Sequence, residues 1–182
     1  KQFLEIHGKP VIVHTIERFS AAPSIDSIVL VLAEDRVEEF EKRRSEFPKL
    51  TAVVAGGLSR AASVLNGLNA VSDECEIVAV HDGARPMVSI DEIERAVAKA
   101  TESGAACLVA AVTDTIKSIR DGEIAATLDR DKLRRALTPQ AFKTQILRRA
   151  FETADLNDAV TEESYLVEKL GHPVAFVEGS SR

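Results

Sequence analysis

The sequence has few aromatic residues and no strongly basic run. Among 182 residues there is no Trp, one Tyr and one Met, and aromatic residues make up 4%. Proteins that bind single-stranded nucleic acids use aromatic side chains for base stacking, and general nucleic-acid binding requires concentrated positive charge. Here 23 basic and 29 acidic residues give a net charge of −6. We therefore expect no nucleic acid among the partners, although a local basic pocket is compatible with this charge.

Cysteines and long apolar runs are also scarce. Cys75 and Cys107 are the two cysteines, and they form neither a CxxC pair nor a Cys/His metal-binding pattern. Isolated cysteines of this kind are typical of reduced thiols in a cytoplasmic protein. No apolar run is long enough to cross a bilayer, and no signal-peptide pattern is visible. The sequence thus predicts a cytoplasmic protein that does not bind membranes.

What is present is an alternation of short apolar runs and amphipathic stretches. Hydrophobic residues make up 45% of the chain and charged residues 29%, which is the balance of a soluble domain with a sizeable core. Strands are predicted at 27–33, 51–55, 77–80, 105–112 and 174–177, with helices at about 35–47, 59–71, 89–102, 144–154 and from 161. This alternation predicts a Rossmann-like α/β fold with a mostly parallel, doubly wound sheet.

The alternation is interrupted between residues 113 and 130. Two strand-like stretches, 113–119 and 123–128, surround Arg120-Asp121-Gly122, and Asp-Gly is a strong hairpin signal. A hairpin inserted into a parallel α/β unit does not join the central sheet easily. We therefore expect residues 113–130 to project as a β-arm, against the same domain or a partner subunit.

The run from Ile77 to Val80 is followed at once by polar residues. Asp82 could bind a divalent cation, Gly83 permits close backbone approach, and Arg85 could bind phosphate or carboxylate. Ligands bind beyond the carboxyl ends of strands in open α/β sheets, which favours a site here. An ordinary strand end with a solvated Asp-Arg pair is the alternative. His81 is interpreted as a structural residue, because no nucleophile or paired base accompanies it.

A second candidate site follows the strand predicted at 51–55. Gly56 and Gly57 precede Arg60 and Ser63 at a strand-to-helix junction, where backbone N–H groups and a helix N-terminus could face an anion. The pattern is neither GxGxxG nor a Walker A loop. A tight turn with a surface arginine is an equally good interpretation of these residues alone.

Several motifs, in order along the chain, resemble the 2-C-methyl-D-erythritol 4-phosphate cytidylyltransferase family of the non-mevalonate isoprenoid pathway. These motifs are the opening KQF, VAGGLSRAASVLNGL, VHDGARP, VTDTIK, LDRDKLRRALTPQAF, VTEES and EKLG. The resemblance implies a nucleotide-sugar-transferase fold and transfer of a cytidylyl group from CTP to 2-C-methyl-D-erythritol 4-phosphate, releasing pyrophosphate. It also implies Mg²⁺ as cofactor and a homodimer joined through an exchanged β-arm.

The resemblance also assigns roles to individual residues. Lys1 would contact the triphosphate and stabilise charge in the transition state, and Asp82 would bind Mg²⁺. The nucleotide-binding positions would be Gly56, Gly57, Arg60 and Ser63. The positions around methylerythritol phosphate would be Arg85, Thr115, Arg130, Thr138 and Thr161, with Thr115 and Arg130 supplied by the partner's arm.

The sequence departs from the family pattern at its ends and at two internal positions. Residues 1–182 are expected to form one cytidylyltransferase domain that lacks the family's N-terminal strand with its glycine-rich loop, and its C-terminal segment. Glu162 replaces the usual Asp, and Ala111 replaces a common Pro. Two alternative functions stay open: a ribitol 5-phosphate cytidylyltransferase, against which Ala84 argues, and a non-catalytic nucleotide-binding module.

Overall fold

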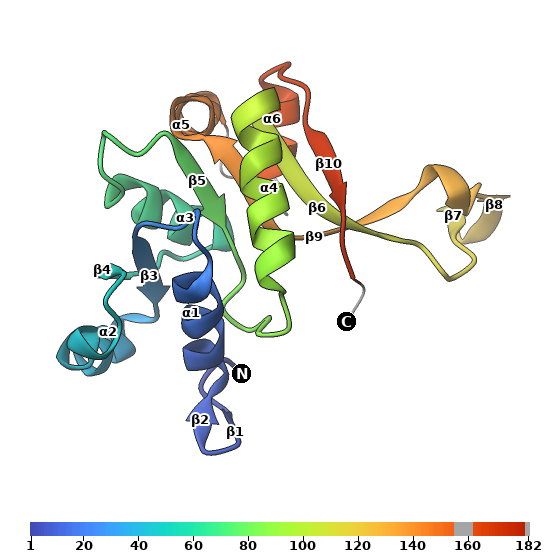
Figure 1. Ribbon diagram of the computed structural model, residues 1–182. Helices are drawn as coiled ribbons and strands as arrows, with labels where there is room; N and C mark the ends of the chain where they lie inside the picture. Colours follow the sequence, from blue (N-terminus) through green and yellow to red (C-terminus); the bar gives the residue numbers. More distant parts are fainter. Residues whose placement is uncertain (155–161, 181–182) are drawn as a thin grey trace.

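The computed structural model describes residues 1–154 and 162–180, in which helices and strands alternate along most of the chain (Figure 1). The helices are α1 (Val11–Ala21), α2 (Glu34–Lys42), α3 (Arg60–Asn69), α4 (Ile90–Ser103), α5 (Thr144–Thr153) and α6 (Glu163–Lys169), with short 3₁₀ turns at Arg44–Glu46 and Arg130–Lys132. The strands are β1 (Glu5–Ile6), β2 (Lys9–Pro10), β3 (Ile28–Leu32), β4 (Leu50–Ala55), β5 (Ile77–Val80), β6 (Ala105–Ala111), β7 (Lys117–Arg120), β8 (Glu123–Thr127), β9 (Arg134–Lys143) and β10 (Ala175–Glu178).

The strands form separate sheets rather than one. A four-stranded sheet has the order β10-β6-β9-β5, and β3 pairs in parallel with β4. A cavity of about 940 Å³ lies between these two sheets and is lined by residues of both β3 and β5. Most of the predicted site residues line this cavity.

The four-stranded sheet is mixed, which differs from the mostly parallel sheet predicted from the alternation. Strand β10 is parallel to β6, but β9 is antiparallel to both β5 and β6. The reason is the connection between β6 and β9, which runs through the β7–β8 hairpin instead of a helical crossover. A strand that returns without a crossover helix pairs antiparallel.

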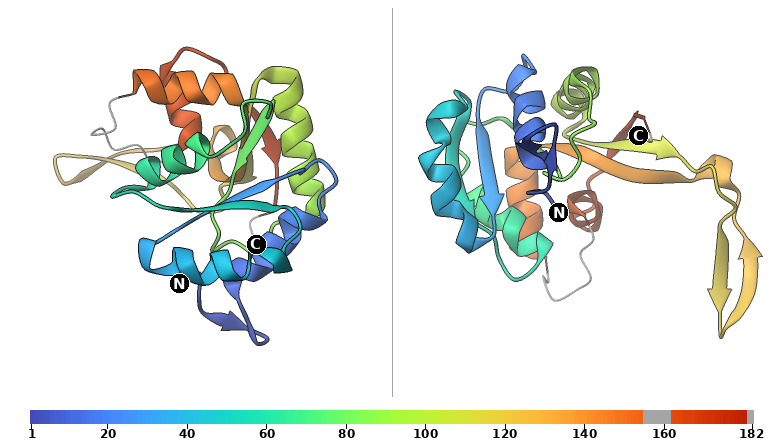
Figure 2. Two further views of the ribbon diagram at one scale, coloured as in Figure 1. Left: turned by 90° about the vertical axis from the view of Figure 1, so that its left-hand side faces the viewer. Right: turned by 90° about the horizontal axis from the view of Figure 1, so that it is seen from below.

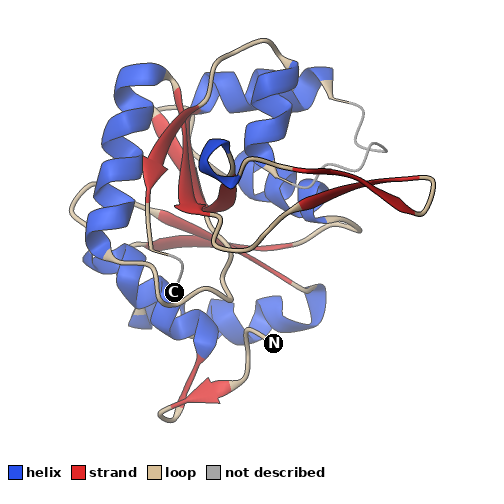
Figure 3. Cartoon of the chain, turned by 90° about the vertical axis from the view of Figure 1, so that its right-hand side faces the viewer, coloured by secondary structure: helices blue, strands red, loops and turns tan. Residues whose placement is uncertain are grey.

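Helices cover both faces of the mixed sheet (Figure 3). Ala106 and Ala141 pack with Ala96 and Ala100 of α4, where small side chains allow the helix to approach closely. On the other face, a cluster from α3, α5 and α6 surrounds the fully buried Phe142. The sheet is therefore buried on both sides, as its continuous apolar strands predicted.

Helix ends follow the local sequence signals. Ser89 caps α4 and forms a complete capping box with Glu92, and Gly104 ends the helix in the left-handed conformation at φ 88°. Ser59 caps α3 by accepting a hydrogen bond from the Ala62 N–H. Serine at a helix start and glycine just past a helix end are the residue types that favour such caps. Helix α6 begins at Glu163, two residues after the predicted start.

The hairpin predicted around Asp121-Gly122 is confirmed. Strands β7 and β8 pair antiparallel, and both turn residues have positive φ angles of 51° and 83°. The hairpin projects well away from the rest of the chain (Figure 2). Ile119 and Ile124 on it have exposed fractions of 63% and 66%.

Candidate active site

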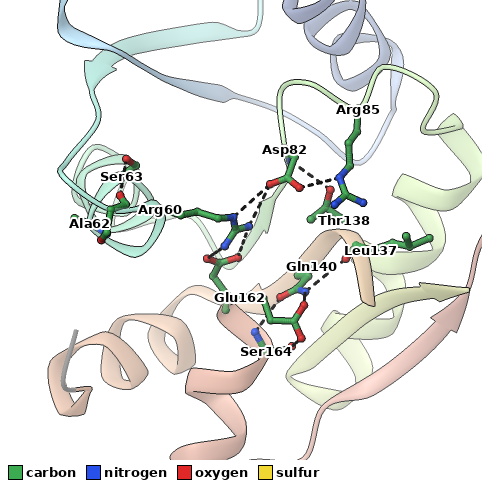
Figure 4. Close-up of polar contacts among 12 residues, drawn as sticks. Arg60, Ala62, Ser63, Asp82, Arg85, Leu137, Thr138, Gln140, Glu162 and Ser164 are labelled. Carbon is green, nitrogen blue, oxygen red and sulfur yellow. Dashed lines mark hydrogen bonds and ion pairs between the residues drawn. The ribbon is translucent and has the colours of Figure 1, made fainter. Parts of the chain in front are cut away.

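Most of the predicted site residues follow the carboxyl ends of β4 and β5 or lie in the middle of β9. Figure 4 shows five of them, namely Arg60, Ser63, Asp82, Arg85 and Thr138. The predicted site residues that line the cavity are Lys1, Gly56, Gly57, Arg60, Ser63, Asp82 and Arg85. Thr138 joins them through a hydrogen bond from the backbone N–H of Asp82 to its Oγ1, at 3.3 Å. Sequence positions more than 50 residues apart thus meet beside the cavity.

Asp82 is the central acidic group and contacts two arginines. Its Oδ2 lies 2.8 Å from Arg85 Nε, and its Oδ1 lies 3.3 Å from Arg60 Nη2. The Asp82 side chain is 32% exposed, so both charge pairs lie at the edge of the cavity and not in the core. A solvated Asp-Arg pair would describe Asp82 and Arg85 alone, but it does not account for the convergence of Arg60 on the same carboxylate.

The loop at Gly56 and Gly57, called the glycine loop below, differs from its expected role in one respect. The N–H of Gly56 donates to the Leu32 carbonyl at 2.7 Å, and the N–H of Gly57 donates to Ser63 Oγ at 3.0 Å. Both groups are engaged inside the protein, so the expectation that they face an anion is wrong in this conformation. The glycines are required by close packing instead: a Cβ on Gly57 would lie 2.5 Å from the Ala62 Cβ.

His81 is half-buried beside the site, and its ring stays neutral near pH 7. Its ring packs on Phe19 with 4.8 Å between ring centroids, and its Nε2 lies 3.0 Å from the Arg85 carbonyl oxygen. Burial lowers the pKa of His81 to about 4. The structural interpretation of this residue is consistent with these contacts, since they hold the segment between Asp82 and Arg85.

Two other predicted residues lie elsewhere, and one lies outside the described residues. Thr115 is exposed at the base of the β7–β8 hairpin, and Arg130 donates to the Thr113 carbonyl at 3.0 Å. Neither lines the cavity of its own chain. Thr161 lies outside the described residues.

Sequence reasoning missed two buried polar residues near the site. Gln140 and Glu163 are fully buried, and Glu163 forms an ion pair with Arg60. Neither residue is among the predicted site residues. No local signal singles out Glu163, because the adjacent Glu162 stands in the same position relative to the apolar residues of α6.

The residues present fit a magnesium site completed by substrate. Mg²⁺ commonly binds one or two carboxylates together with substrate phosphates and water. Asp82 supplies such a carboxylate at the cavity edge. Among residues 1–154 and 162–180 no group of three or more His, Cys, Asp or Glu side chains could bind a metal by itself. Phosphate oxygens would therefore have to provide further ligands.

No helix among the described residues is long and apolar enough to cross a membrane.

Comparison with known proteins shows the family to which the chain is similar. The family model for 2-C-methyl-D-erythritol 4-phosphate cytidylyltransferase matches residues 1–182. A protein of that name from Alkaliphilus oremlandii is 40% identical over 185 residues, covering 99% of this chain and 78% of the relative. One from Solibacter usitatus is 41% identical over 189 residues, covering 100% of this chain and 78% of the relative.

Solved structures of proteins with this activity in their names are also similar to the chain. The 4-diphosphocytidyl-2C-methyl-D-erythritol synthase of Anaerococcus prevotii has a TM-score of 0.90 at 27% identity, with coverage of 97% of this chain and 80% of that one. A cytidylyltransferase from Thermus thermophilus has a TM-score of 0.82 at 31% identity, with coverage of 100% and 84%.

The family model and the curated relatives place the chain in the class of nucleotidyltransferases, and the α/β fold with Arg60 and Arg85 beside Asp82 is compatible with that class. More narrowly, the chain belongs to the 2-C-methyl-D-erythritol 4-phosphate cytidylyltransferase family. The resemblance found in its motifs is thereby confirmed, as is the expected enzyme class. The reaction expected from that resemblance, between CTP and methylerythritol phosphate, is the reaction of this family.

Proposed function

We propose that the cavity between β3 and β5 binds CTP with Mg²⁺, and that methylerythritol phosphate binds on the Arg85–Thr138 side of Asp82. The observation that carries this proposal is the meeting of Arg60, Asp82 and Arg85 beside the glycine loop. Arg60 and Arg85 can donate to phosphate oxygens, and Asp82 can bind a metal ion, so these groups suit a metal-bound triphosphate better than a neutral ligand.

The proposed reaction is direct. An oxygen of the sugar phosphate attacks the α-phosphorus of CTP, the bond from that phosphorus to the oxygen bridging to the β-phosphorus breaks, and pyrophosphate leaves. Such a transfer depends on in-line positioning and charge neutralisation, so no protein nucleophile is required. Bound Mg²⁺ supplies charge neutralisation on the phosphates.

Each residue has a defined task in this proposal. Asp82 holds the metal, Lys1 and Arg60 neutralise the triphosphate, and Arg85 and Thr138 position the sugar phosphate. Gly56, Gly57 and Ser63 shape the loop beside the base. Because both glycine N–H groups are engaged, the loop would recognise the cytosine amino group through hydrogen-bond acceptors.

We further propose that the protein is a homodimer in which the β7–β8 arm of each subunit completes the partner's site. Support comes from the exposed apolar residues on the arm and from the position of Thr115 and Arg130 away from their own cavity. An apolar surface of this kind is typical of an interaction site. In the dimer, Thr115 and Arg130 would reach the sugar phosphate together with Thr161.

The test is a substrate panel on the full-length protein. We expect kcat/KM for CTP to exceed that for UTP, ATP and GTP by about 10²-fold or more, because a mismatched base leaves buried polar groups without partners. Methylerythritol phosphate should be preferred over ribitol 5-phosphate. Preference for ribitol 5-phosphate would favour the related activity, whereas CTP binding without pyrophosphate release would favour a non-catalytic module.

A further inference from the structure

The guanidinium of Arg60 lies between two carboxylates. Its Nη1 and Nη2 donate to the two carboxylate oxygens of Glu163 at 2.5 and 3.0 Å. Its Nε and Nη2 donate to Asp82 Oδ1 at 3.4 and 3.3 Å. Arginine has five N–H donors in a fixed plane, so most of its hydrogen-bonding capacity is divided between these two acids.

The two acids are unequal partners. The contacts with Glu163 are shorter and bidentate, and the Glu163 side chain is 0% exposed, whereas that of Asp82 is 32% exposed. A buried carboxylate is costly to the fold unless a cation pairs with it. Burial raises the pKa of Glu163, while Arg60 opposes that change. Burial alone would lower the pKa of Arg60, but its bonds to Glu163 keep that pKa raised.

Glu163 is itself held by contacts at the start of α6. The Ser164 N–H donates to Gln140 Oε1 at 2.9 Å, and Gln140 Nε2 donates to Glu162 Oε2 at 2.9 Å. Gln140 belongs to β9 and is fully buried. The first turn of α6 is thus fixed to the central sheet, and the Glu163 carboxylate has a defined position from which to hold Arg60.

We propose that Glu163 is a positioning residue that anchors Arg60, and that Asp82 is the exchangeable partner which releases Arg60 donors to the nucleotide. This inference rests on the proposed function of the cavity. A metal ion bound at Asp82 would compete with Arg60 for the same Oδ1 oxygen. The longer Asp82 contacts would then break first, leaving Arg60 held by Glu163 with its Nε–H and one Nη2–H available to phosphate oxygens.

Glu163→Gln tests the anchor, because it keeps the shape of the side chain and removes its charge. The measurement is the Kd of CTP for the full-length protein in excess Mg²⁺. We expect about tenfold weaker binding, because an unanchored Arg60 turns toward Asp82. Charge alone would have the opposite effect, since removing a negative group near a triphosphate tightens binding. Unchanged or tighter binding overturns the proposal.

The matched control is Glu168→Gln, an identical change of charge at an exposed position of the same helix. Its Kd should stay within about twofold of the wild-type value, and a weakening equal to that of Glu163→Gln would point to the helix rather than the anchor. If Glu163→Gln fails to fold, Glu163→Asp provides the second variant. It retains the charge but shortens the reach, and wild-type affinity in a folded Glu163→Asp would overturn the proposal.

A double-mutant cycle shows whether Glu163 acts through Arg60. In an Arg60→Ala background, Glu163→Gln should change the CTP Kd by less than about twofold, because the residue to be positioned is gone. A further tenfold loss in that background would mean that Glu163 acts independently, which contradicts the proposal. Absence of CTP binding by the wild-type protein would instead refute the proposed function of the cavity.

Discussion

The Thr138 hydroxyl accepts a hydrogen bond from the backbone N–H of Asp82 across 3.3 Å, joining residues 56 positions apart. Thr138 belongs to β9, and Asp82 follows β5, its neighbour in the sheet. Thr138 falls where β9 pairing with β6 is irregular, between Ala136 and Gln140. At this irregularity the Thr138 side chain of the four-stranded sheet faces the segment that carries Asp82.

Thr138→Val should therefore disturb the site without destroying the fold. The change leaves the Asp82 N–H without its acceptor, at a cost of about 1–3 kcal/mol in the free energy of unfolding. Urea unfolding measures that loss, and kcat/KM should fall with it. Thr138→Ser, which keeps the hydroxyl, is the matched control. Unchanged stability and kcat/KM in Thr138→Val would show that this hydrogen bond contributes little to the fold or the site.

Asp82→Asn should abolish Mg²⁺-dependent turnover and leave the fold intact. Asparagine has nearly the same shape but loses the charge that a magnesium ligand needs. Pyrophosphate release by the full-length protein measures the effect, and circular dichroism checks the fold. Asp73→Asn serves as control, since Asp73 is 89% exposed and pairs with Arg148 on the surface. Near wild-type turnover of Asp82→Asn would exclude it as the metal ligand.

Gly57→Ala should impair CTP binding through overpacking. Its new Cβ would lie 2.5 Å from Ala62 Cβ and 3.1 Å from the Ala62 carbonyl carbon, so the loop has to move. Overpacking of this kind costs about 1–3 kcal/mol. The Kd of CTP should rise together with a fall in stability. Leu58→Ala, at the neighbouring and fully exposed side chain, should change neither quantity. Wild-type CTP affinity of Gly57→Ala would show that the loop does not shape the nucleotide site.

The parts of the fold that follow local rules could be predicted from sequence. Strand β5 is marked by a short apolar run, and helix α4 is marked by its capping residues. The hairpin is marked by the turn residues Asp121-Gly122. Strand β9 could not be predicted, because Pro139 in its middle argues against a strand. In the structure Pro139 lies at the irregular part of the β9–β6 pairing, where the missing N–H costs no regular ladder bond.

The candidate site was predictable only in part for a related reason. Asp82 and Arg60 stand in recognisable patterns, but the pairing of Arg60 with Glu163 joins residues 103 positions apart. Such a contact depends on the path of the chain between α3 and α6, which no local pattern contains. The two glycine N–H groups were misassigned because their partners, Leu32 and Ser63, are also defined only by the folded loop.

His81 should make stability sensitive to acid. Because burial lowers its pKa from 6.5 to about 4, the folded state prefers neutral His81, and the unfolded state takes up the proton first as the pH falls. The contribution of neutral His81 to the free energy of unfolding is complete above pH 6.5 and is lost as the pH decreases toward 4. The total is about 3 kcal/mol, since one pKa unit corresponds to about 1.4 kcal/mol.

Urea unfolding across this pH range measures the effect. His81→Asn should remove that part of the acid sensitivity, so the difference in stability between wild type and variant should shrink from pH 7 to pH 4. His7→Asn, at an exposed turn position with positive φ, should follow the wild type throughout. A constant difference between wild type and His81→Asn would show that this residue does not titrate with folding.

Active sites shared between subunits predict complementation between two inactive variants. Arg130 lies after β8 at the base of the arm and outside its own cavity, whereas Asp82 lines that cavity. In the proposed dimer, the site formed around Asp82 of one subunit uses Arg130 of the other. Arg130→Ala and Asp82→Asn should each be nearly inactive alone, because each removes one charged group from every site.

A mixed dimer places both lesions in one site and leaves the other site intact. With equal mixing and random exchange, half of the dimers are mixed, so activity should recover to roughly a quarter of the wild-type value. Lys132→Ala is the matched control, since Lys132 is in the same turn but pairs with Asp129 at 3.6 Å on the surface. It should be active alone. Persistent inactivity of the mixture, despite demonstrated subunit exchange, would place Arg130 and Asp82 in the site of one subunit, and the arm would then serve dimerisation only.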